Sequence, residues 1–530
     1  MNEGSGKYVL LLYGALLGVL LPWLVGKWWY GTQRLTKEKV LRSSASELFQ
    51  EYDDNITDEG VVNALSRGQE FVDALGAKAD LGITKIEQKL LQEGESVGNS
   101  SKSRESVRGF EGVRRKAAAL LWSYLSRLHL DGGALDDGES IVIAFPCRRS
   151  DAKIEKYEAA PIAHKLIDSF IAITLAFGNT GPLLSAYRTS QHLIQAIPPS
   201  NSPLLQLPHV TPEIARAIEH PLTQSHLSIH ELMAMPEYKR RKLVTDQPAP
   251  APQLSPAEYS TAMSVARQLP FLHVERAYFK VVGEKFITPS SLVSFVVKSR
   301  VIPPGTANVP DVNPKDLEDV DPEEGDVDAL LGRRSAGRGK GAKLQSATNP
   351  PAKDAEVLPP LAHAPYFPRD HSPRYHIFLA DSKMGKIAVP PFTMTSFDKP
   401  VFDEKTGQPT FNIQTFRMQF QAPPQQGSYS FVMHVVCDSY IGSDSEQPIT
   451  LVVESSEKAE EISSEEDISD PEEDSIAGQM RALQSGNLSG ASSKPKRKKV
   501  VVEESSDEES GTDEEESDTS ATDTETEDEG

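Results

Sequence analysis

The chain has 530 residues, of which 38% are hydrophobic and 25% charged, and its formal net charge is −22. A chain of this length predicts several domains rather than one. Acidic residues gather at the C-terminal end: residues 501–530 hold 15 of them with no Lys or Arg, and residues 454–500 hold 11 with 7 basic residues. The rest of the chain is therefore almost neutral. This argues against a nucleic-acid-binding body, because such domains are normally basic.

Residues 8–26 (YVLLLYGALLGVLLPWLVG) form a run of 19 residues without a charge. A helix of this length is about long enough to cross the ~30 Å hydrocarbon core of a bilayer. The run is longer than the apolar core of a typical signal peptide, so the sequence favours a transmembrane helix over residues 8–30 rather than a cleaved signal. Four aromatic residues are expected to anchor its end in the membrane interface, namely Trp23, Trp28, Trp29 and Tyr30.

Basic residues flank this helix unequally. Only Lys7 precedes it, whereas five follow it, namely Lys27, Arg34, Lys37, Lys39 and Arg42. Because positive charge stays in the cytosol, residues 1–7 are predicted on the far side of the membrane and residues 31–530 in the cytosol. The glycosylation sequons at Asn55, Asn99 and Asn487 are then expected to be bare.

Residues 31–275 are predicted to form a mainly helical domain. Apolar helices are expected over 117–130, 162–177 and 183–196. Thr211-Pro212-Glu213 and Ser255-Pro256-Ala257-Glu258 each place a capping hydroxyl, a proline and an acid in the order that starts a helix.

From about Ala277 the apolar pattern changes to period two, which is typical of strands. Strands are expected over 291–301, 375–380, 386–389, 411–420, 431–437 and 449–453. Short strands separated by Pro and Gly predict a β-sandwich of the immunoglobulin or fibronectin type, built from 276–302 and 362–455. Residues 303–361 are rich in Pro, Gly, Asp and Ala and are expected to be a disordered inserted loop. The fold class is thus α+β and multidomain, with one transmembrane helix and a tail.

Residues 456–530 form an acidic tail that is too polar to fold on its own. Several of its hydroxyl residues have an acid three positions later, a pattern that acidophilic kinases favour, and seven are taken as candidate sites: Ser463, Ser464, Ser505, Ser506, Thr522, Thr524 and Thr526. Each phosphate would add about 1.5 to 2 negative charges. A polyanion of this kind is expected to capture a basic segment of another protein, although it could also serve only as a solvating tail.

Other patterns are weak. Residues 332–340 (GRRSAGRGK) lack the Ser or Thr of a phosphate loop, and His226 and His230 lack the glutamate of an HExxH metal helix. Residues 204–218 have a helix–turn–helix cadence without a glycine-rich turn, so we interpret them as a packing unit. The basic run at 494–499 resembles a nuclear import signal, which a membrane anchor would keep from acting.

No catalytic nucleophile, cofactor motif or metal site is predicted. The two cysteines, Cys147 and Cys437, lie far apart, which excludes a disulfide framework and a CxxC zinc module and suits a reducing compartment. The chain is therefore expected not to be an enzyme.

Three blocks carry a resemblance: residues 202–218 (SPLLQLPHVTPEIARAI), 234–244 (AMPEYKRRKLV) and 415–453, which contains CDSYIGSD. They resemble the fungal-type SEC63 family, subunits of the post-translational protein translocon of the endoplasmic reticulum. The resemblance implies a helical domain followed by a fibronectin-like sandwich. It implies that the sandwich binds the SEC61 channel and that the tail binds the basic end of the SEC62 subunit, beside other translocon subunits. The first seven residues would be luminal and the chain would lie in the endoplasmic reticulum membrane.

The family also has two further membrane helices and a luminal J domain ahead of this helix. The His220-Pro221 pair here lacks the Asp of the J-domain motif, so recruitment of the luminal chaperone is not expected, and a truncated gene model is the simplest account. Three alternatives are a membrane-anchored adaptor unrelated to translocation, a membrane-bound enzyme, and a large helicase carrying the same helix–sandwich module. The helicase predicts ATPase motifs and no membrane helix, the reverse of what this sequence has.

Overall fold

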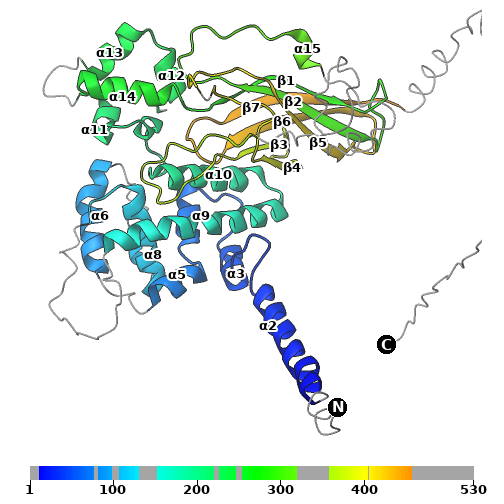
Figure 1. The fold of residues 1–530 in the computed structure, drawn as a ribbon. Coiled ribbons are helices and arrows are strands. Elements are labelled where there is room, and N and C mark those ends of the chain that lie inside the picture. The colour runs from blue at the N-terminus through cyan, green and yellow to red at the C-terminus, as the bar shows by residue number, and fades with distance from the viewer. Residues whose placement is uncertain are drawn as a thin grey trace, which may run out of the picture. The chain divides into compact units, whose positions relative to one another are not determined.

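The computed structural model describes residues 11–76, 82–97, 107–130, 152–219, 226–245, 253–318, 357–403 and 405–455. Helices occupy the first half of this chain and strands the second half (Figure 1). The helices are η1 (Leu16–Leu20), α2 (Leu21–Gln33), α3 (Arg42–Gln50), α4 (Asp58–Leu65), α5 (Gln69–Leu75), α6 (Ile83–Val97), α8 (Gly112–Leu125), α9 (Ala152–Phe177), α10 (Thr180–Gln195), η4 (Pro203–Gln206), α11 (Pro212–Ile218), α12 (Ile229–Ala234), α13 (Glu237–Thr245), α14 (Pro256–Ala266) and α15 (Pro314–Leu317). The strands are β1 (Leu272–Lys280), β2 (Leu292–Val301), β3 (Tyr375–Asp381), β4 (Ile387–Met394), β5 (Gln414–Gln421), β6 (Gly427–Cys437) and β7 (Ser445–Val453).

The core of the helical part is built around α8, whose run of alanines and leucines from Ala117 to Leu121 is fully buried. A helix that is apolar on all sides must be covered on all sides, and α8 contacts α4, α5, α6, α9 and α10. One ion pair lies inside this core, where Lys116 Nζ is 2.9 Å from Glu155 on α9. The predicted long apolar helices are confirmed, although α9 begins ten residues earlier than expected and includes Pro161.

Both predicted helix starts are confirmed. Thr211 caps α11, since its hydroxyl accepts a hydrogen bond from the Ile214 N–H. Ser255 caps α14 in a reciprocal arrangement with Glu258, so that two otherwise unpaired backbone N–H groups are satisfied.

The strands form two antiparallel sheets, of order β1-β2-β5 and β4-β3-β6-β7. Both contribute side chains to one hydrophobic cluster. Phe279 on β1 illustrates this, because its ring contacts Phe295 and Phe420 of its own sheet and Phe431 of the other. The α+β class is therefore confirmed, whereas the immunoglobulin or fibronectin type of the sheets stays a prediction.

Two boundaries differ from those expected. Residues 272–275, assigned above to the helical domain, already belong to β1, because α14 ends at Ala266 and the alternation of buried Leu272 with exposed His273 starts at once. Phe411, expected in a strand, precedes β5 and has a positive φ of 55°, which a strand cannot accommodate.

The boundaries predicted for the disordered loop, 303–361, include residues that are ordered. Residues 303–318 and 357–361 have defined structure. Arg300 at the end of β2 donates to the carbonyl of Pro310 at 2.6 Å, and Asn313 caps α15. These bonds order a Pro-rich segment whose composition alone predicts disorder. The remainder of that loop, 319–356, and the acidic tail from 456 onward lie outside the described residues.

Candidate functional site

The most specific sequence block lies where the helical part meets the sheets. Helix α10 lies against the sheets (Figure 1). Its Leu183 and Tyr187 pack with Phe378 and Ala380 of β3 and Val436 of β6. The turn between β6 and β7, residues 437–444, carries the CDSYIGSD sequence. We call this contact of α10 and η4 with β3, β6 and the 437–444 turn the junction.

Three buried glutamines hold the turn: Gln191 and Gln195 on α10 and Gln206 on η4. Their side-chain amides donate to backbone carbonyls of the turn at Cys437, Ser439 and Ile441, with distances of 2.6, 2.8 and 2.9 Å. Gln206 also accepts from the Ile441 N–H at 2.9 Å. An uncompensated buried carbonyl costs about 1–3 kcal/mol, so these amides stabilise the turn in its position against the helices. Gln191 and Gln195 are four residues apart and therefore share one face of α10.

A buried charge network lies beside the turn. Asp438 accepts from the Arg374 guanidinium at 2.7 Å and lies 3.3 Å from His371. Arg374 reaches on to Asp168 of α9 at 3.1 Å, so it bridges the sheet and the helices. Although burial raises the pKa of Asp438, the His371 hydrogen bond and the Arg374 charge hold it well below its usual range. Burial, followed by the His371 charge, lowers the pKa of His164 to about 4.

His164, His371 and Asp438 also place three possible metal-ligand atoms within 4.8 Å of one another. The Asp438 carboxylate is already occupied by Arg374 and by the Ser439 hydroxyl at 2.6 Å. A cation would compete with the guanidinium for this carboxylate, so we interpret the cluster as a hydrogen-bonded network that fixes the junction.

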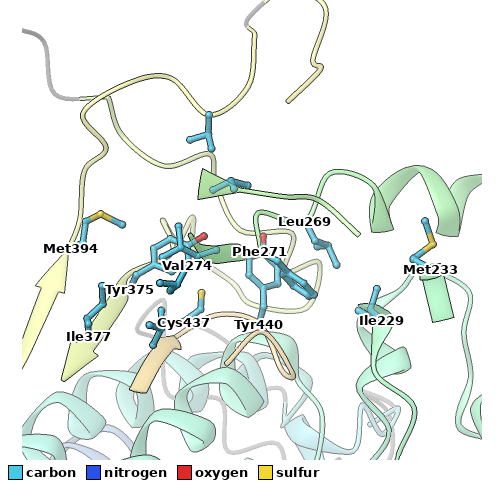
Figure 2. Close-up of a cluster of buried hydrophobic side chains, with 14 of the residues drawn as sticks. Ile229, Met233, Leu269, Phe271, Val274, Tyr375, Ile377, Met394, Cys437 and Tyr440 are labelled. Carbon is cyan, nitrogen blue, oxygen red and sulfur yellow. The ribbon is translucent and has the colours of Figure 1, made fainter. Parts of the chain in front are cut away.

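Apolar side chains complete the junction. Figure 2 shows Cys437 and Tyr440 of the turn grouped with Phe271 and Tyr375. The Tyr375 hydroxyl donates to the carbonyl of Pro270 at 2.6 Å, which ties β3 to the segment that leads into β1. Burial raises the pKa of the Cys437 thiol well above its ordinary value, so this cysteine stays neutral and acts as a small apolar side chain.

Asp444 makes the junction sensitive to pH. Asp444 is exposed as a whole residue, but the protein atoms packed around its carboxyl desolvate that group and raise its pKa to about 7, despite hydrogen bonds from Gln191 and the Cys437 N–H. In an unfolded chain this carboxyl loses its proton near pH 3.9. Between these two pH values the folded state binds a proton that the unfolded state has released. The contribution of this carboxyl to the free energy of unfolding is therefore fully present below about pH 4 and is lost as the pH rises towards 7.

We expect Asp444→Asn to remove this dependence. Between about pH 5 and about pH 8 the native chain should lose about 1 kcal/mol of unfolding free energy that the variant keeps, less than a fully buried carboxyl would lose because Asp444 is exposed. Urea unfolding at a series of pH values measures it. Glu237→Gln is the matched control, because it removes an exposed carboxylate of α13, outside the junction, and should leave the slope unchanged. Equal slopes for the native and Asp444→Asn chains would contradict the prediction.

The predicted membrane anchors lie on an exposed helix. Leu11–Trp28 has the length and composition of a membrane span and none of it is buried. Trp23 and Trp28 are exposed, and the Trp29 and Tyr30 side chains lie outside the described part of the structure. Residues 155–177 of α9 pass the same test, but 39% of that window is buried against other helices. The seven predicted phosphorylation sites lie outside the described residues.

Of the two histidines singled out as a possible metal pair, His226 makes structural contacts. The His226 ring nitrogens lie 2.9 Å from Glu219 and from the Ser200 carbonyl, which ties the loop before α12 to η4 and α11. His230 is exposed on α12. Sequence reasoning missed the junction residues, although the four-residue spacing of two glutamines in an apolar helix was a signal that could have indicated them.

Known proteins match this chain over most of its length, although no family model matches it. The chain is 24% identical over 478 residues to the "Translocation protein sec63" of Schizosaccharomyces pombe, covering 88% of this chain. It is 24% identical over 505 residues to the "Protein translocation protein SEC63" of Saccharomyces cerevisiae, again over 88% of this chain. The similarity to these relatives supports the assignment of the chain to the SEC63 family. It spans 62% of the length of each of these two relatives.

A more distant match concerns the helicase alternative. A "DExH-box ATP-dependent RNA helicase DExH13" of Arabidopsis thaliana is 20% identical over 349 residues, which cover only 12% of the helicase. The two yeast SEC63 relatives match more of this chain, 88%, at higher identity, 24%, and they are named for translocation. In this chain the 437–444 block forms the contact of the sheets with α10 and η4.

Proposed function

We propose that this chain is a non-enzymatic subunit of the protein translocation complex of the endoplasmic reticulum. Helix α2 would anchor it as a single-pass protein with residues 31–530 in the cytosol. The two sheets would bind the SEC61 channel, and the acidic tail would bind the basic end of a SEC62-type subunit. Together these contacts would support post-translational import of secretory proteins.

The observation that carries this proposal is the similarity to two translocation proteins over 88% of the chain. The junction supports a coupling role. Because Arg374 bridges Asp438 and Asp168 and three glutamines hold the turn, a force on the sheets passes to α9 and α10 through buried polar contacts. Such a rigid connection suits a subunit that acts by binding and allosteric coupling rather than by bond chemistry.

Affinity purification of the tagged full chain from endoplasmic reticulum membranes in mild detergent tests the proposal. We expect the channel subunit to co-purify with the full chain and with a chain lacking residues 501–530, since the sheets are intact in both. Recovery from membranes washed at alkaline pH checks the anchor independently.

Absence of the channel subunit from both purifications would refute the translocon role. A membrane-anchored adaptor unrelated to translocation would then be the better hypothesis for this chain. The proteins that do co-purify would identify its partners.

A further inference from the structure

The chain turns back on itself directly after the apolar helix. Helix α2 ends at Gln33, and the Arg42 N–H at the start of α3 donates to the Arg34 carbonyl at 3.0 Å. Inside this turn the Thr36 N–H donates to Val40 at 2.7 Å and the Lys39 N–H donates to Thr36 at 3.0 Å. We call residues 34–42 the basic turn. The start of α3 is therefore hydrogen-bonded directly to Arg34, the residue that follows α2, which closes the turn between the two helices.

The basic turn is fixed to the helical domain. Val40 is fully buried, and the Leu41 N–H donates to Glu70 of α5 at 2.9 Å. The Ser44 hydroxyl also donates to Glu70 and accepts from the Gln69 N–H. The turn consequently holds one orientation relative to the domain.

The exposed surface of this turn is positively charged. Its four basic side chains are exposed, namely Arg34, Lys37, Lys39 and Arg42, and none of them forms an ion pair within the described residues. Glu38, which is partly exposed, is the one acid among residues 34–42. A compact group of cations at the end of an apolar helix complements a negatively charged headgroup layer.

Apolar side chains accompany these charges. Leu35 in the turn is 39% exposed and Phe49 on α3 is 56% exposed. Phe49 is two helical turns after Arg42, so both lie on the same side of α3. The Phe49 ring stacks at 5.5 Å on Phe177, which is itself 39% exposed. Basic and aromatic side chains on one surface are typical of segments that lie in the membrane interface.

We propose that the basic turn and Phe49 form a second membrane contact, which binds anionic phospholipid headgroups of the bilayer that α2 crosses. This inference rests on the proposed membrane span. Its consequence is mechanical: with α2 in the bilayer and the turn on its surface, the helical domain is held at two points and keeps a defined tilt above the membrane.

Hydrogen exchange on the full chain in lipid nanodiscs tests this surface. We expect the backbone amides of residues 34–49 to exchange more slowly in nanodiscs of phosphatidylcholine with phosphatidylserine than in phosphatidylcholine alone. Removing two charges with Lys37→Gln and Lys39→Asn should abolish most of the difference, since each charge contributes about fivefold in binding. Asn suits position 39 because its φ is 61°.

The matched control is Lys239→Gln with Lys242→Gln, which removes two exposed charges from α13 and should leave the lipid effect intact. Equal exchange in both lipids, or loss of the effect in the control as well, would overturn the proposal. A change in the amide exchange of residues 34–49 when residues 501–530 are deleted would also overturn the proposal, because the acidic tail, not lipid, would then be bound to the basic turn. Failure of the native chain to enter nanodiscs would instead refute the membrane span.

Discussion

Asp438→Asn should lower the free energy of unfolding by about 3 kcal/mol, because removing one partner of a buried ion pair typically costs 3–5 kcal/mol. The Asp438 side chain is 1% exposed and that of Arg374 is 27% exposed, so we take the lower end of that range. The asparagine keeps an oxygen for the hydrogen bonds of the turn but loses the charge that offsets Arg374. Urea unfolding of the full chain in detergent measures the loss.

Two variants separate the pair from its surroundings. Asp168→Asn removes the outer, 35% exposed partner of Arg374 and should cost less than about 1 kcal/mol. Arg374→Met removes the cation, and in the double variant with Asp438→Asn the two losses should not add, because both break one interaction. Additive losses, or a loss from Asp438→Asn no larger than that from Asp168→Asn, would mean that the network does not hold the junction.

Deleting residues 501–530 should weaken binding of a SEC62-type basic segment by about two orders of magnitude, while channel binding is unchanged. The deleted segment holds 15 acidic residues and no basic ones, so attraction to a basic peptide is mostly long-range and electrostatic. Binding measured by fluorescence anisotropy at a series of salt concentrations should fall steeply with salt for the native chain and weakly for the deletion.

A tail of equal length with its acids replaced by Asn and Gln is the matched control. It should behave as the deletion does, which assigns the effect to charge rather than to chain length. Phosphorylation of the native tail at the predicted serines and threonines should strengthen binding, and alanine at all seven should remove that gain. Native affinity in the neutralised tail would disprove this role.

Much of the architecture was readable from local patterns. The capping sequences at Thr211 and Ser255 predict helix starts because a capping hydroxyl acts on backbone N–H groups two or three residues away. The alternation of Phe431, Met433 and Val435 predicts a strand because one sheet face is buried. The run 8–26 indicates a membrane helix by length and lack of charge. The acidic tail is likewise a property of composition, which needs no tertiary contact.

The junction depends on the tertiary structure. Gln191, Arg374 and Asp438 are ordinary polar residues in the sequence, separated by more than 60 positions from one another or from their partners. Their roles arise because folding buries them together, where low polarity strengthens charge pairs and makes an unpaired carbonyl costly. The sequence by itself thus predicted the main helices and strands, an apolar helix long enough to span a membrane, and the acidic composition of residues 456–530. Only the tertiary structure decided which polar side chains join the helices to the sheets, because burial, not residue type, makes those contacts strong.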